Sequence, residues 1–185
     1  DVIPLALGIE TLGGTFSKII TGNTTIPIEE SETFTTNVDN QTSIDVNIFQ
    51  GERELIKDCR ALGQFKLRGI PPMKAGLPLV KVMFRVDANG ILTVSAIEKR
   101  SGKKAEIEVI PFHGLTQFEI ERIMEDSFEH AVDDFNERQL IEFHQTAERV
   151  FRGIEQCWKV AENALSESDR DEILKQMDVV RQSMK

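Results

Sequence analysis

The sequence is poor in the residues that mark disulfide, metal and membrane proteins. Its two cysteines, Cys59 and Cys157, are far apart and show no Cys-x-x-Cys spacing, so we expect neither a disulfide framework nor a zinc site, and a reducing compartment fits best. The three histidines show no i, i+3 or i, i+4 spacing with one another, and no metal site is expected. No apolar run approaches the roughly eighteen residues of a membrane span, and the N-terminus lacks the pattern of a signal peptide.

Basic residues are outnumbered by acidic ones. The net charge of -9 and the pI near 4.9 argue against a nucleic-acid surface, which requires clustered Lys and Arg. The densest basic cluster, "EKRSGKK" at 98–104, falls at an expected turn and is interpreted as a solvated hairpin tip. With 40% apolar and 29% charged residues, the 185-residue chain has the composition of a soluble globular protein of one ordinary or two small domains.

Proline and glycine nearly disappear after residue 114. All six prolines and eleven of the twelve glycines lie at or before that position, and only Gly153 follows it. Charge changes at the same place, because residues 1–112 carry a net charge of -1 and residues 113–185 carry -8. We therefore predict two parts, a first domain at 1–112 and a second at 113–185.

The first part alternates apolar and polar residues with a period of two. This pattern at 44–48, 80–86 and 105–109 predicts half-buried strands. "DANG" at 87–90 and "SGK" at 101–103 are hairpin signals, and 60–67 is interpreted as a strand. Short strands and frequent turns without a helical period predict an antiparallel β-sandwich over 1–112.

The second part changes to a helical period. Thr116 with Glu119 forms a capping box, which predicts a helix from about Gln117. Apolar residues then recur at helical spacing to about Leu165, as one long helix or as two with a bend. "SESD" at 166–169 restarts a helix with more apolar positions than a solitary helix covers. We expect a truncated helical bundle at 113–185 and, since the chain begins at Asp1, a fragment of a longer protein.

Residues that carry chemistry are not arranged for catalysis. No Ser, Cys or Thr sits in a recognisable nucleophile motif, so no catalytic residue and no enzyme activity are predicted. "GIETLGG" at 8–14 lacks the Lys-Ser/Thr pair of a phosphate loop and does not open a helix. The carboxylate pairs at 29–30 and 133–134 are interpreted as solvated surface. Gly13 and Gly14 either form a tight turn or let an extended peptide approach the backbone, and both readings stay open.

Six motifs carry a resemblance to a known family. "DVIPLALGIETLGG", "NTTIPIEESETFTT", "DNQTSIDVNIFQGER", "LGQFKLRGIPP", "VDANGILTVSA" and "GLTQFEIERI" resemble, in this order, the substrate-binding domain and lid of the seventy-kilodalton heat-shock chaperones. The resemblance covers essentially the whole chain. Residues 50–76 resemble the HscA branch, which serves iron–sulfur cluster assembly, more closely than the general DnaK branch, because of Asp58–Arg60 and Leu67–Pro71.

The resemblance implies a peptide cleft at one end of a β-sandwich, closed by a helical lid. Ile44 is expected to floor the central pocket, and Leu12 is expected to face Asn37 in an arch that the family usually builds from two apolar residues. Asn37 either leaves this arch unbridged or hydrogen-bonds the peptide backbone. The full set implied to line the cleft is Ile9, Thr11, Leu12, Phe34, Thr35, Asn37, Gln41, Ile44, Val46 and Val80.

A lid latch and several partners are also implied by the resemblance. The family's latch arginine is replaced by Ala75, and the substitute latch is expected among Asp39, Lys74, Glu148 and Arg152. The implied client is the iron–sulfur scaffold protein, bound through a Leu-Pro-Pro-Val-Lys segment and presented by a J-domain co-chaperone. The chain's own ATPase domain, which would hold ATP and Mg, is implied to precede Asp1.

No cofactor is expected within these 185 residues, and neither nucleic acid nor a membrane is an expected partner. The implied location is the bacterial cytoplasm, with the mitochondrial matrix as the less favoured one. Two alternatives remain: a general DnaK-like folding chaperone, and an assembly module that oligomerises through its helical arm.

Overall fold

The computed structural model describes residues 1–161 and 164–184 of the chain. The described residues form ten strands, three α-helices and one short 3-10 helix, Ile56–Asp58. The strands are β1 Val2–Ile3, β2 Leu7–Thr11, β3 Thr15–Ile20, β4 Thr24–Thr25, β5 Ile28–Thr35, β6 Ser43–Gln50, β7 Arg60–Arg68, β8 Leu79–Val86, β9 Leu92–Glu98 and β10 Lys104–Val109. The helices are α1 Gln117–Glu129, α2 Ala131–Ala161 and α3 Glu167–Ser183. The strands predicted at 44–48, 60–67, 80–86 and 105–109 are confirmed.

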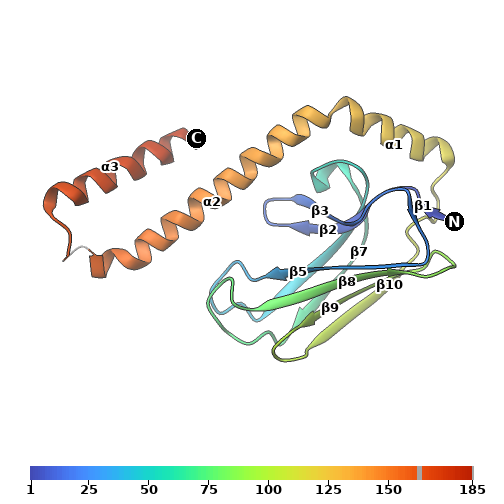
Figure 1. Ribbon diagram of the computed structural model, residues 1–185, viewed down its shortest axis with the longest axis horizontal. Coiled ribbons are helices and arrows are strands. Elements are labelled where there is room, and N and C mark those ends of the chain that lie inside the picture. The colour runs from blue at the N-terminus through green and yellow to red at the C-terminus, as the bar shows by residue number, and fades with distance from the viewer. Residues whose placement is uncertain (162–163, 185) are drawn as a thin grey trace. The chain divides into compact units, whose positions relative to one another are not determined.

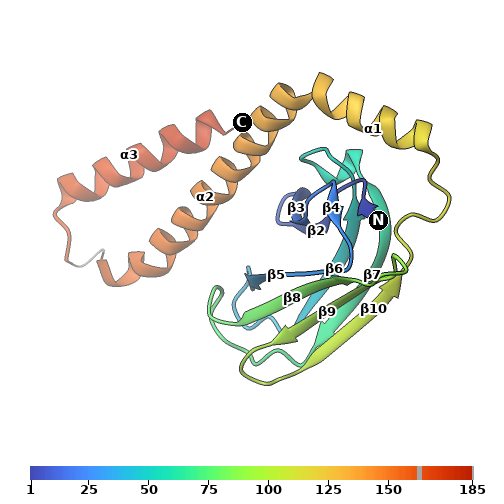
Figure 2. The same cartoon turned by 45° about the vertical axis from the view of Figure 1, so that its right-hand side comes forward.

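The longer strands form two four-stranded antiparallel sheets (Figure 1). One sheet has the order β3-β2-β6-β7 and the other has the order β10-β9-β8-β5. β1 and β4 pair separately as a two-stranded ribbon. Both sheets are visible in a second orientation in Figure 2.

A single apolar core takes side chains from both sheets. On β8, Val82 and Phe84 are buried while Arg85 is exposed, so the predicted alternation along this strand is confirmed. The core cluster joins residues of β2, β3, β6 and β7 to residues of β8 and β9. This arrangement is compatible with a β-sandwich that is followed by helices.

Glycines with positive φ close the predicted hairpins. Gly90 and Gly102, at the β8–β9 and β9–β10 turns, have φ of 80° and 69°, a region that other residues rarely adopt. Gly13 and Gly14 have φ of 83° and 76°, and the Gly14 N–H donates to the Thr11 carbonyl at 3.2 Å. The structure therefore shows a tight turn at the glycine pair, and the approach of a peptide to this backbone stays a prediction.

The helices begin where the capping signals predict. Thr116 caps α1 with its side chain, and Glu119 completes the capping box. Ser166 caps α3 by accepting from the Asp169 N–H at 3.2 Å. His130 separates α1 from α2, so the stretch after residue 117 forms two helices, while residues 162 and 163 of the expected run to Leu165 lie outside the described residues.

The chain divides into two compact units, Asp1–Asp134 and Phe135–Lys185. The first unit includes the strands, α1 and the first turn of α2, so this division falls later than the predicted change at 112, and the functional boundary at 112 stays a prediction. Within the described ranges, none of the helices has the length and apolarity needed to cross a bilayer.

Candidate functional site

Three loops of the first unit meet at one end of the two sheets. The end of β5 pairs with the start of β8, and the start of β6 pairs with the end of β7. β2 runs antiparallel to β6, so its final residues also lie at the start of β6. The register therefore places the loops 12–14, 36–42 and 69–78 at the same end of the two sheets.

Main-chain and side-chain hydrogen bonds join the loops 36–42 and 69–78. The backbone N–H of Asn40, in the left-handed region at φ 59°, is one of the donors. The bonds run from Asn40 N to Met73 O at 2.7 Å, from Ala75 N to Asp39 Oδ1 at 2.8 Å, from Gly76 N to Thr36 O at 3.0 Å, and from Gly69 N and Ile70 N to Thr42 O at 3.0 Å each. The two loops thus form one connected unit.

The third loop, 12–14, is held by the connection between β6 and β7. The Ile56 N–H donates to the Gly14 carbonyl at 3.0 Å, and the Phe16 N–H donates to the Glu54 carbonyl at 2.9 Å. The side chains of Thr11 and Thr15 hydrogen-bond across the base of the loop at 2.6 Å. These contacts fix the backbone on both sides of Leu12.

The residues predicted to line a peptide cleft fall into a buried group and an exposed group. Five of them, Ile9, Phe34, Ile44, Val46 and Val80, belong to or pack against the single core cluster. Leu12 is 45% exposed, Thr35 and Asn37 are exposed, and Thr11 and Gln41 are half-buried. The structure thus brings five of the six apolar members into the shared core and leaves Leu12 partly exposed, while the role of all six in binding stays a prediction.

The Gln41 side chain forms two hydrogen bonds within its own loop. Its Oε1 accepts from the Asn37 N–H at 3.3 Å, and its Nε2 donates to the Ser43 carbonyl at 2.8 Å. The Gln41 side chain thereby bridges the loop and positions the backbone of Asn37. The Asn37 side chain remains exposed, and its predicted pairing with Leu12 stays a prediction.

The four residues predicted for a latch are divided between the two units. In the first unit, Asp39 uses Oδ1 to accept from Ala75, and Lys74 is exposed beside it. In the second unit, Glu148 and Arg152 are exposed one turn apart on α2. The latch itself stays a prediction.

A buried ion pair that the sequence analysis missed joins the β6–β7 connection to the helices. Arg53 donates to both carboxylate oxygens of Asp134, at 2.6 Å from Nε and 2.8 Å from Nη2, and its Nη1 also bonds Asp126. The Arg53 and Asp134 side chains are only 10% and 5% exposed. The interpretation of Asp134 as a solvated carboxylate is therefore wrong, because Arg53 compensates its charge inside the structure.

This pairing shifts the titration of both groups. The hydrogen bond from Arg53 holds the pKa of Asp134 below its usual value, and the same bond raises the pKa of Arg53. The Glu54 N–H also donates to Asp134, at 3.3 Å. Since the Glu54 carbonyl in turn accepts from the Phe16 N–H, hydrogen bonds link the first turn of α2 through Glu54 to the start of β3.

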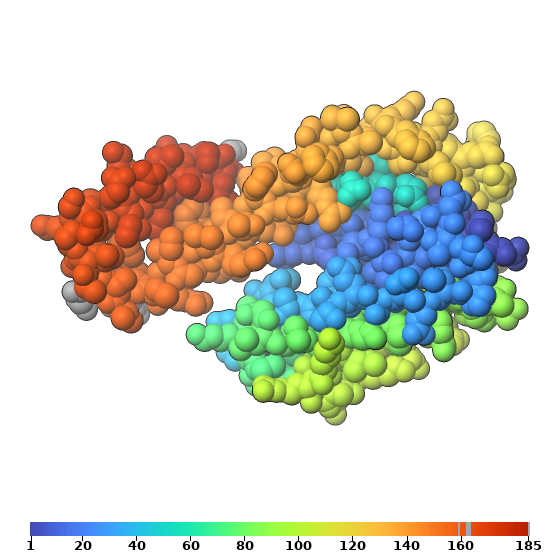
Figure 3. All heavy atoms as spheres, viewed as in Figure 1, coloured from blue at the N-terminus to red at the C-terminus, as the bar shows by residue number. Residues whose placement is uncertain are grey.

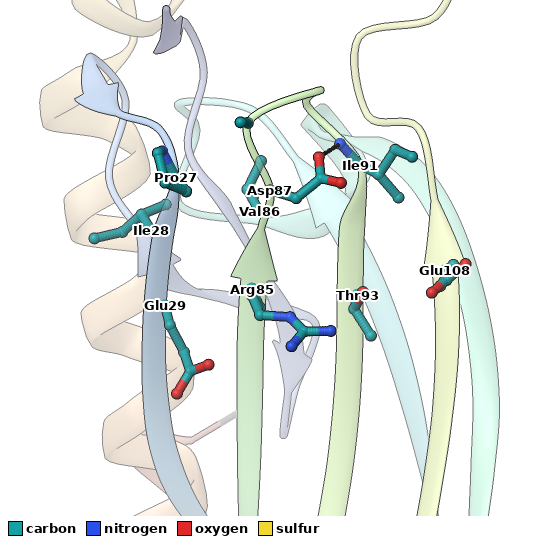
Figure 4. Close-up of a pocket in the computed structure, with 10 residues that line it drawn as sticks. Pro27, Ile28, Glu29, Arg85, Val86, Asp87, Ile91, Thr93 and Glu108 are labelled. Atoms are coloured by element: carbon teal, nitrogen blue, oxygen red, sulfur yellow. Dashed lines mark hydrogen bonds between the residues drawn. The ribbon is translucent and has the colours of Figure 1, made fainter.

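A separate hollow of about 480 Å³ lies at the opposite end of the β10-β9-β8-β5 sheet. Figure 4 shows Arg85 extending toward Thr93 within it, and Asp87 accepting from the Ile91 N–H at 2.9 Å. None of the predicted binding residues lines this hollow. In the described part of the chain, no three His, Cys, Asp or Glu side chains are placed to hold a metal ion.

Comparison with known proteins identifies the family. The family model for Hsp70 proteins matches residues 1–185. The chain is 49% identical over 183 residues to the chaperone protein HscA homolog of Pseudomonas aeruginosa, and 45% identical over 184 residues to that of Methylococcus capsulatus. These alignments cover 98% and 100% of the chain but 30% of each relative, so the chain spans less than a third of their length. The chain belongs to the Hsp70 family of chaperones.

Proposed function

We propose that this chain is the substrate-binding part of an HscA-like chaperone and that it holds extended peptide segments. The observation that carries the proposal is the placement of three loops at the same end of the two sheets, next to apolar residues of the shared core. Burial of one aliphatic peptide side chain there contributes roughly 1.5–3 kcal/mol. Main-chain hydrogen bonds to an extended peptide add affinity that tolerates different sequences.

The residues proposed to line the cleft differ in burial, and this difference suggests which of them a peptide could contact. Val46 and Val80 are 2% and 1% exposed, so they support the floor from within the core. Ile44 and Phe34 are half-buried, and Leu12 is 45% exposed, so part of each of these side chains can contact a peptide. Under this proposal Ile44 sets the size of the central pocket.

The proposed client is an iron–sulfur scaffold protein with a Leu-Pro-Pro-Val-Lys segment, presented by a J-domain co-chaperone. The HscA homologs among the relatives and the 58–60 and 67–71 sequences support this choice over a general folding chaperone. All the relatives named above are bacterial, which supports the bacterial cytoplasm as the location.

The glycine-rich turn at 8–14 does not fit the phosphates of a nucleotide. The Gly13–Gly14 turn joins two strands, opens no helix and is not followed by the Lys-Ser/Thr pair that binds phosphates in a P-loop. We therefore place no ATP chemistry in these residues and expect no ATP hydrolysis by the isolated chain. Control of peptide exchange by ATP and Mg is a proposal about the whole protein.

Fluorescence anisotropy with a labelled Leu-Pro-Pro-Val-Lys peptide tests the proposal. We expect Ile44→Phe to weaken binding at least tenfold because the larger side chain fills the pocket. Ile97→Phe, on the outer face of β9, is the matched control and should leave binding unchanged. Equal affinity for a leucine-rich peptide would favour the general chaperone, and no binding of either peptide would reject the proposed function.

A second candidate, an assembly module, rests on the helices of the second unit. Leu140, Phe143 and Val150 on α2 are 58%, 67% and 54% exposed, which is the kind of surface that mediates association. Sedimentation velocity over a range of concentrations distinguishes the two functions. Self-association that Phe143→Ser abolishes, in a chain that binds no peptide, would support the assembly module.

A further inference from the structure

An apolar hollow flanked by cations lies on the outer side of the 69–78 loop. It has a volume of about 480 Å³ and adjoins the β9–β10 hairpin. Figure 3 shows the green atoms around residues 70–80 beside the yellow-green atoms of the hairpin. The lining residues are Met73, Leu77, Leu79, Glu98, Lys99 and Arg100.

The hollow is held in shape by contacts from the hairpin to the start of β8 and to the 69–78 loop. The Lys99 N–H donates to the Leu79 carbonyl at 2.9 Å, and Arg100 Nη1 contacts Met73 Sδ at 3.0 Å. Leu77 and Leu79 are nevertheless 62% and 45% exposed. Two large aliphatic side chains therefore face solvent on a backbone that is fixed.

The one acidic residue in the lining is turned inward. Glu98 is 1% exposed, and its carboxylate accepts the backbone N–H groups of Arg100, at 3.1 Å, and of Ser101. Its charge is thus used to close the hairpin turn. What the hollow presents to solvent is aliphatic surface beside the two exposed cations Lys99 and Arg100.

These cations are available to a partner. Across residues 1–161 and 164–184, no carboxylate forms an ion pair with Lys99 or Arg100, whereas the nearby Lys104 pairs with Glu106 at 2.6 Å. The chain as a whole carries a charge of -9, so an exposed cation pair beside aliphatic side chains is a local reversal of its surface character. Complementary charge steers encounter and sets the orientation of partners.

We propose that this hollow is a docking site for an acidic segment of a partner protein. An aliphatic or aromatic side chain of the segment enters between Leu77 and Leu79, and flanking Asp or Glu residues pair with Lys99 and Arg100. A hollow of this size is within the range of sites that accept a ligand group. A bilayer offers a broad plane of headgroups and cannot enter a concave surface in this way, which favours a protein segment.

The site is distinct from the proposed peptide cleft but shares a loop with it. The Met73 carbonyl accepts from Asn40 in the 36–42 loop, while the Met73 side chain lines the hollow. A docked partner would therefore sit beside the loops of the cleft without occupying the floor under Ile44. The proposal does not require that the cleft binds peptides.

Anisotropy with a fluorescein-labelled Glu-Asp-Leu-Phe-Glu-Asp peptide tests the docking site, in the presence of saturating unlabelled Leu-Pro-Pro-Val-Lys peptide. We expect K99E/R100E to weaken binding at least tenfold, and Leu77→Ser to weaken it about threefold. The double variant R85E/R122E reverses two exposed cations elsewhere in the first unit and should change affinity less than twofold. A Gln-Asn-Leu-Phe-Gln-Asn peptide should bind at least tenfold more weakly, since it lacks the charges.

Several results would overturn the proposal. These are no binding of the acidic peptide to the folded chain, equal binding by K99E/R100E with unchanged circular dichroism, and displacement by the Leu-Pro-Pro-Val-Lys peptide.

Two further results would replace the proposed occupant by another. Co-sedimentation with phosphatidylserine vesicles that K99E/R100E abolishes, without peptide binding, would replace the partner protein by a membrane. Self-association that the same variant abolishes would replace it by a second copy. A separate titration with labelled Leu-Pro-Pro-Val-Lys peptide alone reports on the cleft, so failure at one site is distinguishable from failure at the other.

Discussion

The two compact units differ in how deeply their apolar side chains are buried. In the first unit, Phe84, Leu92 and Val94 are fully buried, as are many other side chains of the two sheets. In the second unit, Met177 is the one apolar side chain that is buried among the described residues. Large apolar side chains such as Phe143 lie mostly exposed on its helices.

This difference indicates what stabilises each unit. The sheets bury apolar area in a shared core, and such burial is the dominant favourable term in folding. The helices of the second unit bury little, so their stability depends on hydrogen bonds within each helix, on caps and on ion pairs, which are individually small. Substitutions of the same chemical kind should therefore have unequal effects in the two units.

The largest inequality is expected between two phenylalanines. Phe84→Ala removes a fully buried ring from the core and should lower the free energy of unfolding by about 3–5 kcal/mol. Phe143→Ala changes a ring that is 67% exposed and should cost no more than about 0.5 kcal/mol. Urea denaturation followed by circular dichroism measures both. Similar losses for the two variants would show that Phe143 is buried in solution and would break the comparison.

The next effect concerns the ion pair that joins the β6–β7 connection to the first turn of α2 within the first unit. Arg53→Ala leaves Asp134 buried without its partner and should cost about 3 kcal/mol, as removal of one member of a buried pair does. Arg122→Ala, at an exposed position of α1, is the matched control with an expected change below about 0.5 kcal/mol. Thermal denaturation of both variants gives the measurement, and a loss below about 1 kcal/mol for Arg53→Ala would contradict a buried role.

The sequence was informative about elements and much less so about contacts between them. Alternation at 80–86 predicted β8, and the Thr116–Glu119 capping box predicted the start of α1, because both patterns are local. The two four-stranded antiparallel sheets are also compatible with the β-sandwich that was predicted for residues 1–112. The short strands β1 and β4 gave no pattern, since two residues cannot show a period.

The contacts that hold the candidate site could not be predicted from local patterns. Asp134 stands 81 positions from Arg53, and its neighbour Asp133 is exposed, so the sequence could not show which carboxylate is buried. Gln41 was placed in the cleft by resemblance, but its hydrogen bonds to Asn37 and Ser43 depend on the shape of the folded loop. Long-range pairing of this kind becomes visible only with the backbone in place.

The third prediction uses the pH dependence of the Asp134 ion pair. Its pKa is lowered in the folded state from an ordinary value of 3.8, so the pair stabilises the protein above that pH and loses this contribution as the pH falls through the folded-state pKa. Asp134→Asn removes the titrating group. We expect the stability difference between the wild-type chain and Asp134→Asn to shrink as the pH is lowered from 6 to about 3 in urea titrations. A difference that stays constant over this range would contradict the pairing.

A smaller effect is expected from the two helix caps. Thr116→Ala removes a capping box from α1 in the first unit, and Ser166→Ala removes the cap of α3 in the second. Each should cost about 1 kcal/mol locally. Because α3 has little buried surface to hold it, Ser166→Ala should reduce the helical signal in far-ultraviolet circular dichroism more than Thr116→Ala does. The reverse order would indicate that α3 is held by packing.

An effect of similar size is expected at the exposed contacts that join α2 and α3. Arg181 on α3 donates to Glu155 on α2 at 2.8 Å, and its guanidinium lies 5.1 Å from the centroid of the Phe151 ring. Exposed ion pairs of this kind contribute about 0.2–1 kcal/mol, and a cation–π contact at an exposed site adds about 0.5–1 kcal/mol.

We expect Arg181→Ala to lower stability by roughly 1 kcal/mol in total and Arg181→Lys to retain part of it, whereas Arg170→Ala, at the start of α3, should leave the contacts of Phe151 unchanged. Hydrogen exchange of the α3 amides measures the change, because this helix opens locally before the sheets unfold. If raising the salt concentration to about 1 M reproduces most of the loss in the wild-type chain, the pair with Glu155 is the larger contribution, and if it does not, the ring of Phe151 is.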